Sequence, residues 1–121
     1  MIDAGFREFI QELFAAMGAI SVRPFFGGGG VYCDGVMFAL VADESLYLKV
    51  DEALKADLAD EGCGPFVWTP KSGKNAGEAV EMSYWRLPDA ALDDPDEAAQ
   101  WGRRALQVAR KAPAKPARKR R

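Results

Sequence analysis

Four consecutive glycines, residues 27–30, are the feature of this chain that most resembles a site for chemistry. Backbone amides of a glycine-rich loop can hold a phosphate, as in GxxxxGK[ST] or in GxGxxG at the start of a helix. Neither pattern continues here, because the following VYCDGVMFAL is typical of a strand. Glycine also permits turns, bulges and the close approach of a neighbouring segment. We therefore expect a structural turn or bulge here, with a phosphate or oxyanion loop as the alternative.

Few other residues offer catalytic chemistry near neutral pH. The chain has two cysteines and no histidine, so it lacks the usual general base and the commonest metal ligand. Cys33 precedes Asp34, whose carboxylate disfavours the thiolate that a reactive cysteine needs. Cys63, between two glycines, is expected to be a small packing residue. We predict that the protein is not an enzyme and uses no metal or cofactor; catalysis by Cys33 or by a carboxylate pair is the alternative.

Charge is distributed unevenly along the chain. From Arg103 onward there are nine basic residues and no acid, whereas residues 1–102 hold seven bases and eighteen acids, a formal charge of −11. Such a basic end can bind the phosphates of nucleic acid without sequence preference. Alternatively, it pairs with the acidic body or aids solubility. The candidate nucleic-acid residues are Lys111, Lys115, Arg118, Lys119, Arg120 and Arg121.

Hydrophobic spacing predicts the elements that carry these residues. Apolar residues recur every three or four positions over 3–17 and 95–112, and a shorter amphipathic helix is expected over 51–62. Strands are expected over 19–26, on both sides of Asp34-Gly35, and over 46–50, 65–69 and 79–87, with Pro24 marking an edge strand or a bend. The predicted order is α-β-β-β-β-α-β-β-α. Tight turns between strands imply antiparallel pairing, so we expect an α+β two-layer sandwich with the helices mainly on one face of an antiparallel sheet.

Aromatic residues are frequent in the predicted strands. They could form a stacking platform for single-stranded nucleic acid, but such a platform needs basic neighbours. The predicted strands supply only Arg23, Lys49 and Arg86, so most rings are expected to lie in the core. Tyr84 and Trp85 are consecutive and should face opposite sides of the sheet, which leaves one of them available to mark a partner surface.

The segment RPFFGGGGVYCDGVMFALVADESLYLKVDE resembles the N-terminal domain of the TfoX/Sxy family. Its pattern is Arg-x-Met-Phe-Gly-Gly-x-Gly, a tyrosine, a short turn, an apolar strand and a Leu-Tyr-Leu-Lys strand. The likeness continues through the MSYW and LDDP stretches to a tryptophan in the last helix and covers about residues 5–110. Phe25 replaces the usual methionine. The positions that match the family motif are Arg23, Phe26, Gly27, Gly28, Gly30, Tyr32, Leu48, Lys49, Pro65, Phe66, Tyr84 and Trp85.

The resemblance implies a two-layer domain with an antiparallel sheet, found in proteins that regulate natural competence. Longer members carry a second, C-terminal domain, so we expect a stand-alone N-terminal domain over residues 1–111 and a disordered basic tail over 112–121. The family supplies no catalytic or ligand chemistry to carry over. The predicted function is therefore a non-enzymatic regulatory module that contributes to transcriptional regulation through protein contacts and through weak nucleic-acid binding by the tail.

Two further expectations concern assembly and location. An open sheet edge invites pairing, so a homodimeric protein–protein adaptor with no nucleic-acid role is the alternative function. No apolar run approaches the length of a membrane helix, and the N-terminus lacks the pattern of a signal peptide. We therefore expect a cytoplasmic protein with no membrane partner.

Overall fold

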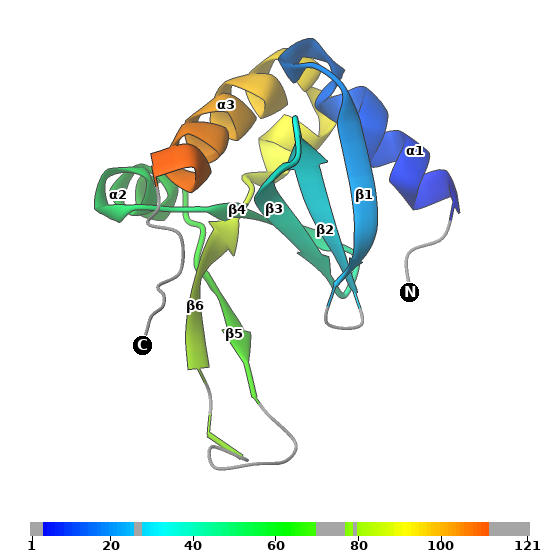
Figure 1. The fold of residues 1–121 in the computed structure, drawn as a ribbon. Helices are drawn as coiled ribbons and strands as arrows, with labels where there is room; N and C mark the ends of the chain where they lie inside the picture. The colour runs from blue at the N-terminus through cyan, green and yellow to red at the C-terminus, as the bar shows by residue number, and fades with distance from the viewer. Residues whose placement is uncertain (1–3, 26–27, 70–76, 79, 112–121) are drawn as a thin grey trace.

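The computed structural model describes residues 4–25, 28–69, 77, 78 and 80–111. Its elements follow the predicted order, with two short 3-10 helices added (Figure 1). They are α1 (Ala4–Leu13), η1 (Ala15–Met17), β1 (Ile20–Phe25), β2 (Gly28–Cys33), β3 (Val36–Ala42), β4 (Ser45–Lys49), α2 (Glu52–Asp60), β5 (Pro65–Trp68), β6 (Val80–Arg86), η2 (Asp89–Asp93) and α3 (Pro95–Lys111).

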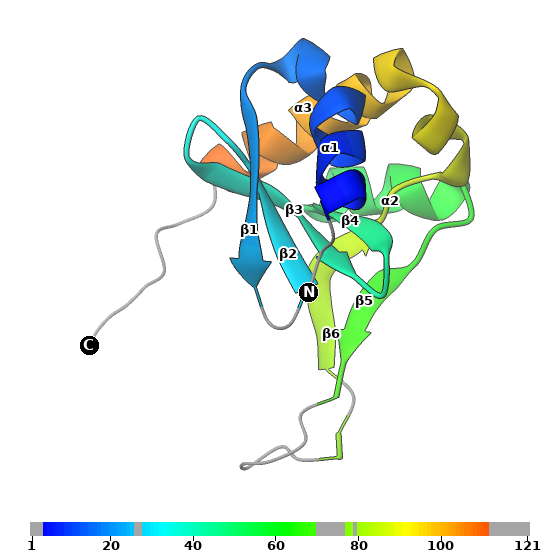
Figure 2. The ribbon, with the colours of Figure 1, turned by 90° about the vertical axis from the view of Figure 1, so that its right-hand side faces the viewer.

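The six strands form one antiparallel sheet in the order β1-β2-β3-β4-β6-β5. Helices α1, α2 and α3 lie on one side of it, while β5 and β6 extend beyond the other strands (Figures 1 and 2). The predicted α+β sandwich with helices on one face is therefore confirmed. β1 lies at an edge of the sheet, as Pro24 indicated.

The core lies between the helices and one face of the sheet. Register places Val22, Val31, Ala39 and Leu48 in a row across β1 to β4, and all four are buried. α3 packs across β3 and β4. Each large apolar side chain buried here contributes on the order of 2 kcal/mol to stability. Among the described helices, none combines the length and apolar character needed to cross a bilayer.

Caps and turns occur where the sequence predicts them. The Asp51 carboxylate accepts a hydrogen bond from the Leu54 amide at 2.9 Å and so begins α2. Asp34 and Gly35 both have positive φ, 54° and 80°, which suits the tight turn between β2 and β3. Asp43 and Glu44 form an equivalent turn between β3 and β4, with φ of 51° and 61°.

The glycine run differs from its prediction. Residues 28–30 lie inside β2, pair with both β1 and β3, and none of them has a positive φ. The irregularity in register falls after them, between Val31 and Tyr32. A turn or bulge at residues 28–30 is therefore wrong; Gly27 lies outside the described residues. Gly28 instead allows close approach, because a Cβ there would overlap the Val41 carbonyl oxygen.

Candidate functional site

A second row of residues points away from the helices. Arg23, Gly30, Leu40, Tyr47 and Arg86 are successive cross-strand partners in β1, β2, β3, β4 and β6. Their chain neighbours form the buried row described above, and successive strand residues face opposite sides. We call this side the outer face and define it as Arg23, Phe25, Gly30, Tyr32, Met37, Leu40, Tyr47, Lys49, Phe66, Tyr84 and Arg86.

Gly30 provides the surface on which the Tyr32 ring lies. A Cβ at Gly30 would stand 3.0 Å from Tyr32 Cε1 and 3.1 Å from Met37 Sδ, so both side chains cross its backbone. Arg23, the β1 partner of Gly30, places its Cζ 5.3 Å from the centroid of the Tyr32 ring. This distance is typical of a cation–π contact. The strand pairing thus assembles a guanidinium, a ring and a methionine around one glycine.

Lys49 and Tyr84 form a second cation–π pair on the outer face. They are partners across β4 and β6, and Lys49 Nζ lies 5.2 Å from the Tyr84 ring centroid. The same ammonium donates a hydrogen bond to Ser83 Oγ at 2.8 Å. Burial, and then the nearby Tyr32 phenol, raise the pKa of Tyr84. Tyr84 is therefore a neutral phenol at physiological pH, available as a hydrogen-bond donor.

The remaining apolar side chains give the outer face a layer of its own. The rings of Tyr47 and Phe66 lie 5.1 Å apart, which joins β5 to this surface. Leu40 is only 3% exposed although it faces away from the helices, and it is not part of the helix-side core. Tyr32, Tyr47, Phe66 and Tyr84 are partly exposed. The outer face therefore combines a packed base with accessible aromatic rings.

The outer face carries the basic residues of the described strands. β1 to β5 contain no acidic residue, and the one acid within the six strands is Glu81 of β6, whose side chain lies outside the described residues. The three strand bases, Arg23, Lys49 and Arg86, all lie on this face, whereas residues 1–102 together carry −11. Of these bases, Arg86 is ion-paired with Asp89, and Lys49 contacts Ser83 and the Tyr84 ring.

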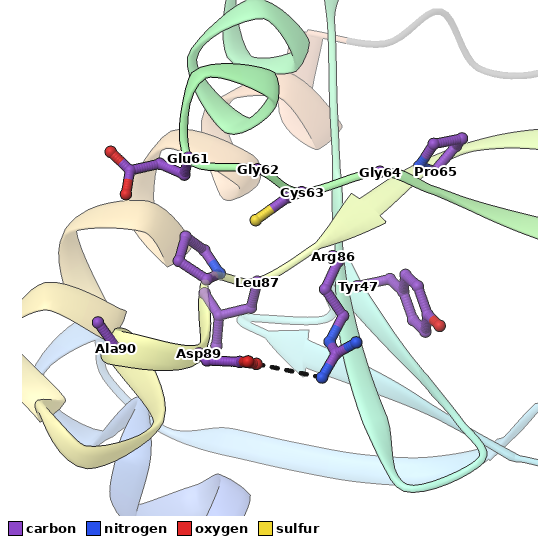
Figure 3. Close-up of a pocket in the computed structure, with 11 residues that line it drawn as sticks. Tyr47, Glu61, Gly62, Cys63, Gly64, Pro65, Arg86, Leu87, Asp89 and Ala90 are labelled. Carbon is purple, nitrogen blue, oxygen red and sulfur yellow. Dashed lines mark hydrogen bonds and ion pairs between the residues drawn. The ribbon is translucent and has the colours of Figure 1, made fainter.

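A pocket of about 410 Å³ shares Tyr47 and Arg86 with the outer face (Figure 3). Within it, Arg86 Nη2 pairs with Asp89 Oδ1 at 3.2 Å. Cys63 also lines the pocket, and burial is the main cause that raises the pKa of its thiol. The pocket therefore offers a protonated thiol and a paired guanidinium rather than an activated nucleophile.

Cys33 is likewise a protonated thiol. It is 1% exposed, donates a weak hydrogen bond to the Met17 carbonyl at 3.8 Å, and faces the helix-side core. Burial, and then the Asp34 carboxylate, raise the pKa of Cys33, while Arg110 opposes the shift. In the part of the chain that the structure describes, no three His, Cys, Asp or Glu side chains gather where they could hold a metal ion.

The structure brings most of the described family-motif residues together. Six motif residues lie on the outer face, although they are spread over five strands: Arg23, Gly30, Tyr32, Lys49, Phe66 and Tyr84. Four motif positions serve other contacts, and two, Phe26 and Gly27, lie outside the described residues. Gly28 packs against β3, Leu48 is in the helix-side core, and Pro65 lines the pocket. Trp85 faces the helices, with Lys55 Nζ 5.8 Å from its ring.

Tyr47 and Arg86 are the residues whose role the sequence prediction missed. Most strand rings were expected in the core, which is wrong for Tyr32, Tyr47 and Phe66. Tyr84 and Trp85 face opposite sides of the sheet, as predicted. The signal is the alternation in SLYLK: Leu46 and Leu48 are buried, so Tyr47 between them must face the other side.

The basic residues near the C-terminus divide into two groups. Three on α3 contact the body: Arg103 donates to the Ala16 carbonyl at 3.0 Å, Arg104 pairs with Asp57 at 2.6 Å, and Arg110 pairs with Asp34 at 3.3 Å. Lys111 is exposed at the end of α3. The other candidate nucleic-acid residues, Lys115, Arg118, Lys119, Arg120 and Arg121, lie outside the described residues.

Comparison with known proteins gives the chain its family. The model of the TfoX N-terminal domain matches residues 12–109. Protein Sxy of Escherichia coli (strain K12) is 31% identical over 80 residues, which are 66% of this chain and 36% of that protein. The chain thus spans about a third of the length of this curated relative. The match to the family model covers most of the sheet and α3, and the chain belongs to the TfoX N-terminal domain family.

Proposed function

We propose that this protein is a non-catalytic regulatory module of the competence-regulator type that acts by binding a macromolecule through its outer face. The observation that carries the proposal is the meeting of six family-motif residues on this face. They point away from the helix-side core, so packing of that core does not account for them. Aromatic and arginine side chains are also the residues enriched at binding surfaces.

The thiols support a binding role over a catalytic one. Both cysteines have a raised pKa, so neither thiol is an activated nucleophile at neutral pH, and the chain has no histidine to act as a general base. The relative named Sxy supports regulation of competence as the biological setting.

A reporter of competence-gene expression in the native host tests the outer face. Arg23→Gln removes an exposed cation from it, and Arg7→Gln removes an exposed cation from α1 as the matched control. We expect Arg23→Gln to lower reporter output severalfold at unchanged protein level, while Arg7→Gln leaves it as in the parent. Equal output from both variants would contradict the proposal.

The tail is proposed as a second, non-specific contact with nucleic acid. Three of the nine C-terminal bases are engaged with the body, which leaves Lys111 and the five beyond it for phosphates. Mobility shifts of duplex DNA by the full chain and by a chain ending at Lys111 test this across a salt series. We expect truncation to weaken binding and to reduce the salt slope by up to about 4 to 5, since each phosphate contact contributes about 0.9. Equal binding of duplex DNA by the full and the truncated chain would show that the tail does not contribute to binding.

A further inference from the structure

We infer that Gly30 is a positioning residue for the outer face: its missing side chain sets the Tyr32 ring, and with it the Arg23 guanidinium, in the arrangement that contacts the partner. The inference rests on the proposed function. It adds to that function which part of the outer face the partner contacts and which residue holds this part in place. Three observations carry it: the backbone of Gly30, the space above this backbone, and the side chains that fill the space.

The backbone conformation of Gly30 does not require a glycine. Gly30 lies inside β2, pairs with Arg23 of β1 and Leu40 of β3, and is not among the glycines with positive φ. A glycine inside a strand weakens it, because glycine loses more backbone freedom on folding and offers no side chain for packing. The reason for glycine at this position therefore lies in the space that a side chain would fill.

Side chains of the outer face fill the space above Gly30. A Cβ at this position would stand 3.0 Å from Tyr32 Cε1, 3.1 Å from Met37 Sδ and 3.3 Å from Met37 Cε. All three atoms belong to side chains, whereas the nearest atoms at Gly28 belong to the backbone of β3. A methyl group at position 30 would therefore displace Tyr32 and Met37 rather than the strands themselves.

The Tyr32 ring contacts further groups on both sides. Arg23 Cζ lies 5.3 Å from its centroid, so a displaced ring would also move the guanidinium or break their cation–π contact. Burial, and then the Tyr32 phenol, raise the pKa of Tyr84, which places the two phenols close enough to interact. The position of this one ring therefore affects side chains on β1 and on β6.

A fixed ring and guanidinium suit a binding surface. Arg23 is exposed and Tyr32 is partly exposed, so a partner can reach both. Arginine and tyrosine are enriched among the residues that dominate binding energy. Holding a side chain in its bound geometry before the partner arrives avoids an ordering cost equivalent to about 2- to 12-fold in affinity. Loss of this preorganisation is the expected effect of a side chain at position 30.

Three glycine-to-alanine variants test the inference, with the competence-gene reporter for function and urea denaturation for stability. At equal protein level, we expect Gly30→Ala to lower reporter output about 2- to 12-fold, if measured where output is proportional to partner occupancy. Its loss of stability should be smaller than that of Gly28→Ala, because side-chain ends move aside more easily than backbone. Gly64→Ala, with nothing within 4 Å of its Cβ position, should keep the parent's output.

Two further measurements show whether Gly30 acts through the ring. Tyrosinate absorbance follows the titration of Tyr84, which Tyr84→Phe identifies. Because the Tyr32 phenol contributes to the raised pKa of Tyr84, Gly30→Ala should change this titration and Gly64→Ala should not. Tyr32→Leu removes the ring itself, so adding Gly30→Ala to Tyr32→Leu should not lower reporter output further.

Each result supports or overturns the inference. Lower output in Gly30→Ala, a changed Tyr84 titration and no further loss in the Tyr32→Leu background support it. An unchanged titration, or a further loss in that background, overturns it, because Gly30 would then act without the ring. Parental output in Gly30→Ala beside lowered output in Arg23→Gln overturns the inference and leaves the proposed function standing. Parental output in both variants overturns both.

A second variant keeps the test decisive if Gly30→Ala fails to fold by circular dichroism. Met37 contributes two of the three atoms nearest to the added Cβ, and Tyr32 contributes the third. Gly30→Ala combined with Met37→Ala therefore relieves most of the crowding but keeps the contact with the ring. Compared with Met37→Ala alone, the double variant should show the same loss of output and the same change in the Tyr84 titration, and equal output from the two would overturn the inference.

Discussion

Gly28 and Gly30 lie two residues apart in β2 and make opposite uses of a missing side chain. At Gly28 the absent Cβ makes room for the backbone of β3, whereas at Gly30 it makes room for Tyr32 and Met37. Backbone cannot move aside as a methionine can. Gly28 is therefore required for the packing of β2 against the backbone of β3, whereas Gly30 is required for the packing of side chains on the outer face.

Gly28→Ala should destabilise the protein. Its Cβ would overlap the Val41 carbonyl oxygen, and overpacking of this kind costs about 1–3 kcal/mol. Gly64→Ala is the matched control, because nothing lies within 4 Å of its Cβ position, and it should change stability by less than about 1 kcal/mol. Urea denaturation measures both. Equal stability of the two variants would show that β2 and β3 separate easily at this point.

Tyr84 makes stability depend on pH in the alkaline range. Burial raises its pKa above the ordinary value near 10, so the folded state holds this proton more tightly than the unfolded state. The contribution is fully present below pH 10 or so and is lost as pH rises through the folded pKa. We expect Tyr84→Phe to reduce the loss of the free energy of unfolding as pH rises above about 10, relative to the parent. Parallel pH profiles for the two proteins would contradict this assignment.

At the scale of elements, the hairpins set the register that creates the outer face. Ala42 pairs with Ser45 across the Asp43-Glu44 turn, and a shift by one residue would send Tyr47 into the core. The turn holds its register with two non-glycine residues at positive φ. Such a conformation costs a residue with a Cβ about 1 kcal/mol or more.

Glu44→Gly should therefore stabilise the protein by about 0.5–1 kcal/mol, because glycine adopts φ near 61° without this strain. The same exchange in an exposed helix has the opposite sign. Glu8→Gly, in α1, should cost about 1 kcal/mol through lost helix propensity. Thermal denaturation of both variants checks the prediction, and a loss of stability in Glu44→Gly would show that its side chain makes a compensating contact.

At the scale of the whole molecule, the described surface has two sheet edges, β1 and β5. β1 carries Pro24 and the exposed Arg23, and β5 has four residues. Proline, charge and short length are features that block pairing between edges. The homodimeric adaptor would need one of these edges, and each opposes self-association.

We therefore expect a monomer in multi-angle light scattering across a concentration series at moderate salt. A mass that rises toward twice that of one chain with concentration would contradict this expectation and favour the adaptor.

The sequence alone determined the number and order of the helices and strands. The spacing of apolar residues predicted the helices. Asp51 was correctly predicted to cap a helix, and Asp34-Gly35 was correctly predicted to form a turn. The antiparallel sheet followed from the short connections between strands. These features are local, since a cap or a two-residue turn depends on atoms a few residues away. The motif that identified the family is also local in sequence.

Only the tertiary structure decided what the rings and glycines do. Arg23, Tyr47 and Arg86 are far apart in the chain, and they became one row because β6 inserts between β4 and β5 in the sheet. Aromatic residues suit both a core and a binding face, so composition could not choose between them. The choice depended on which face the helices covered, and that is fixed by long-range packing rather than by any short stretch of sequence.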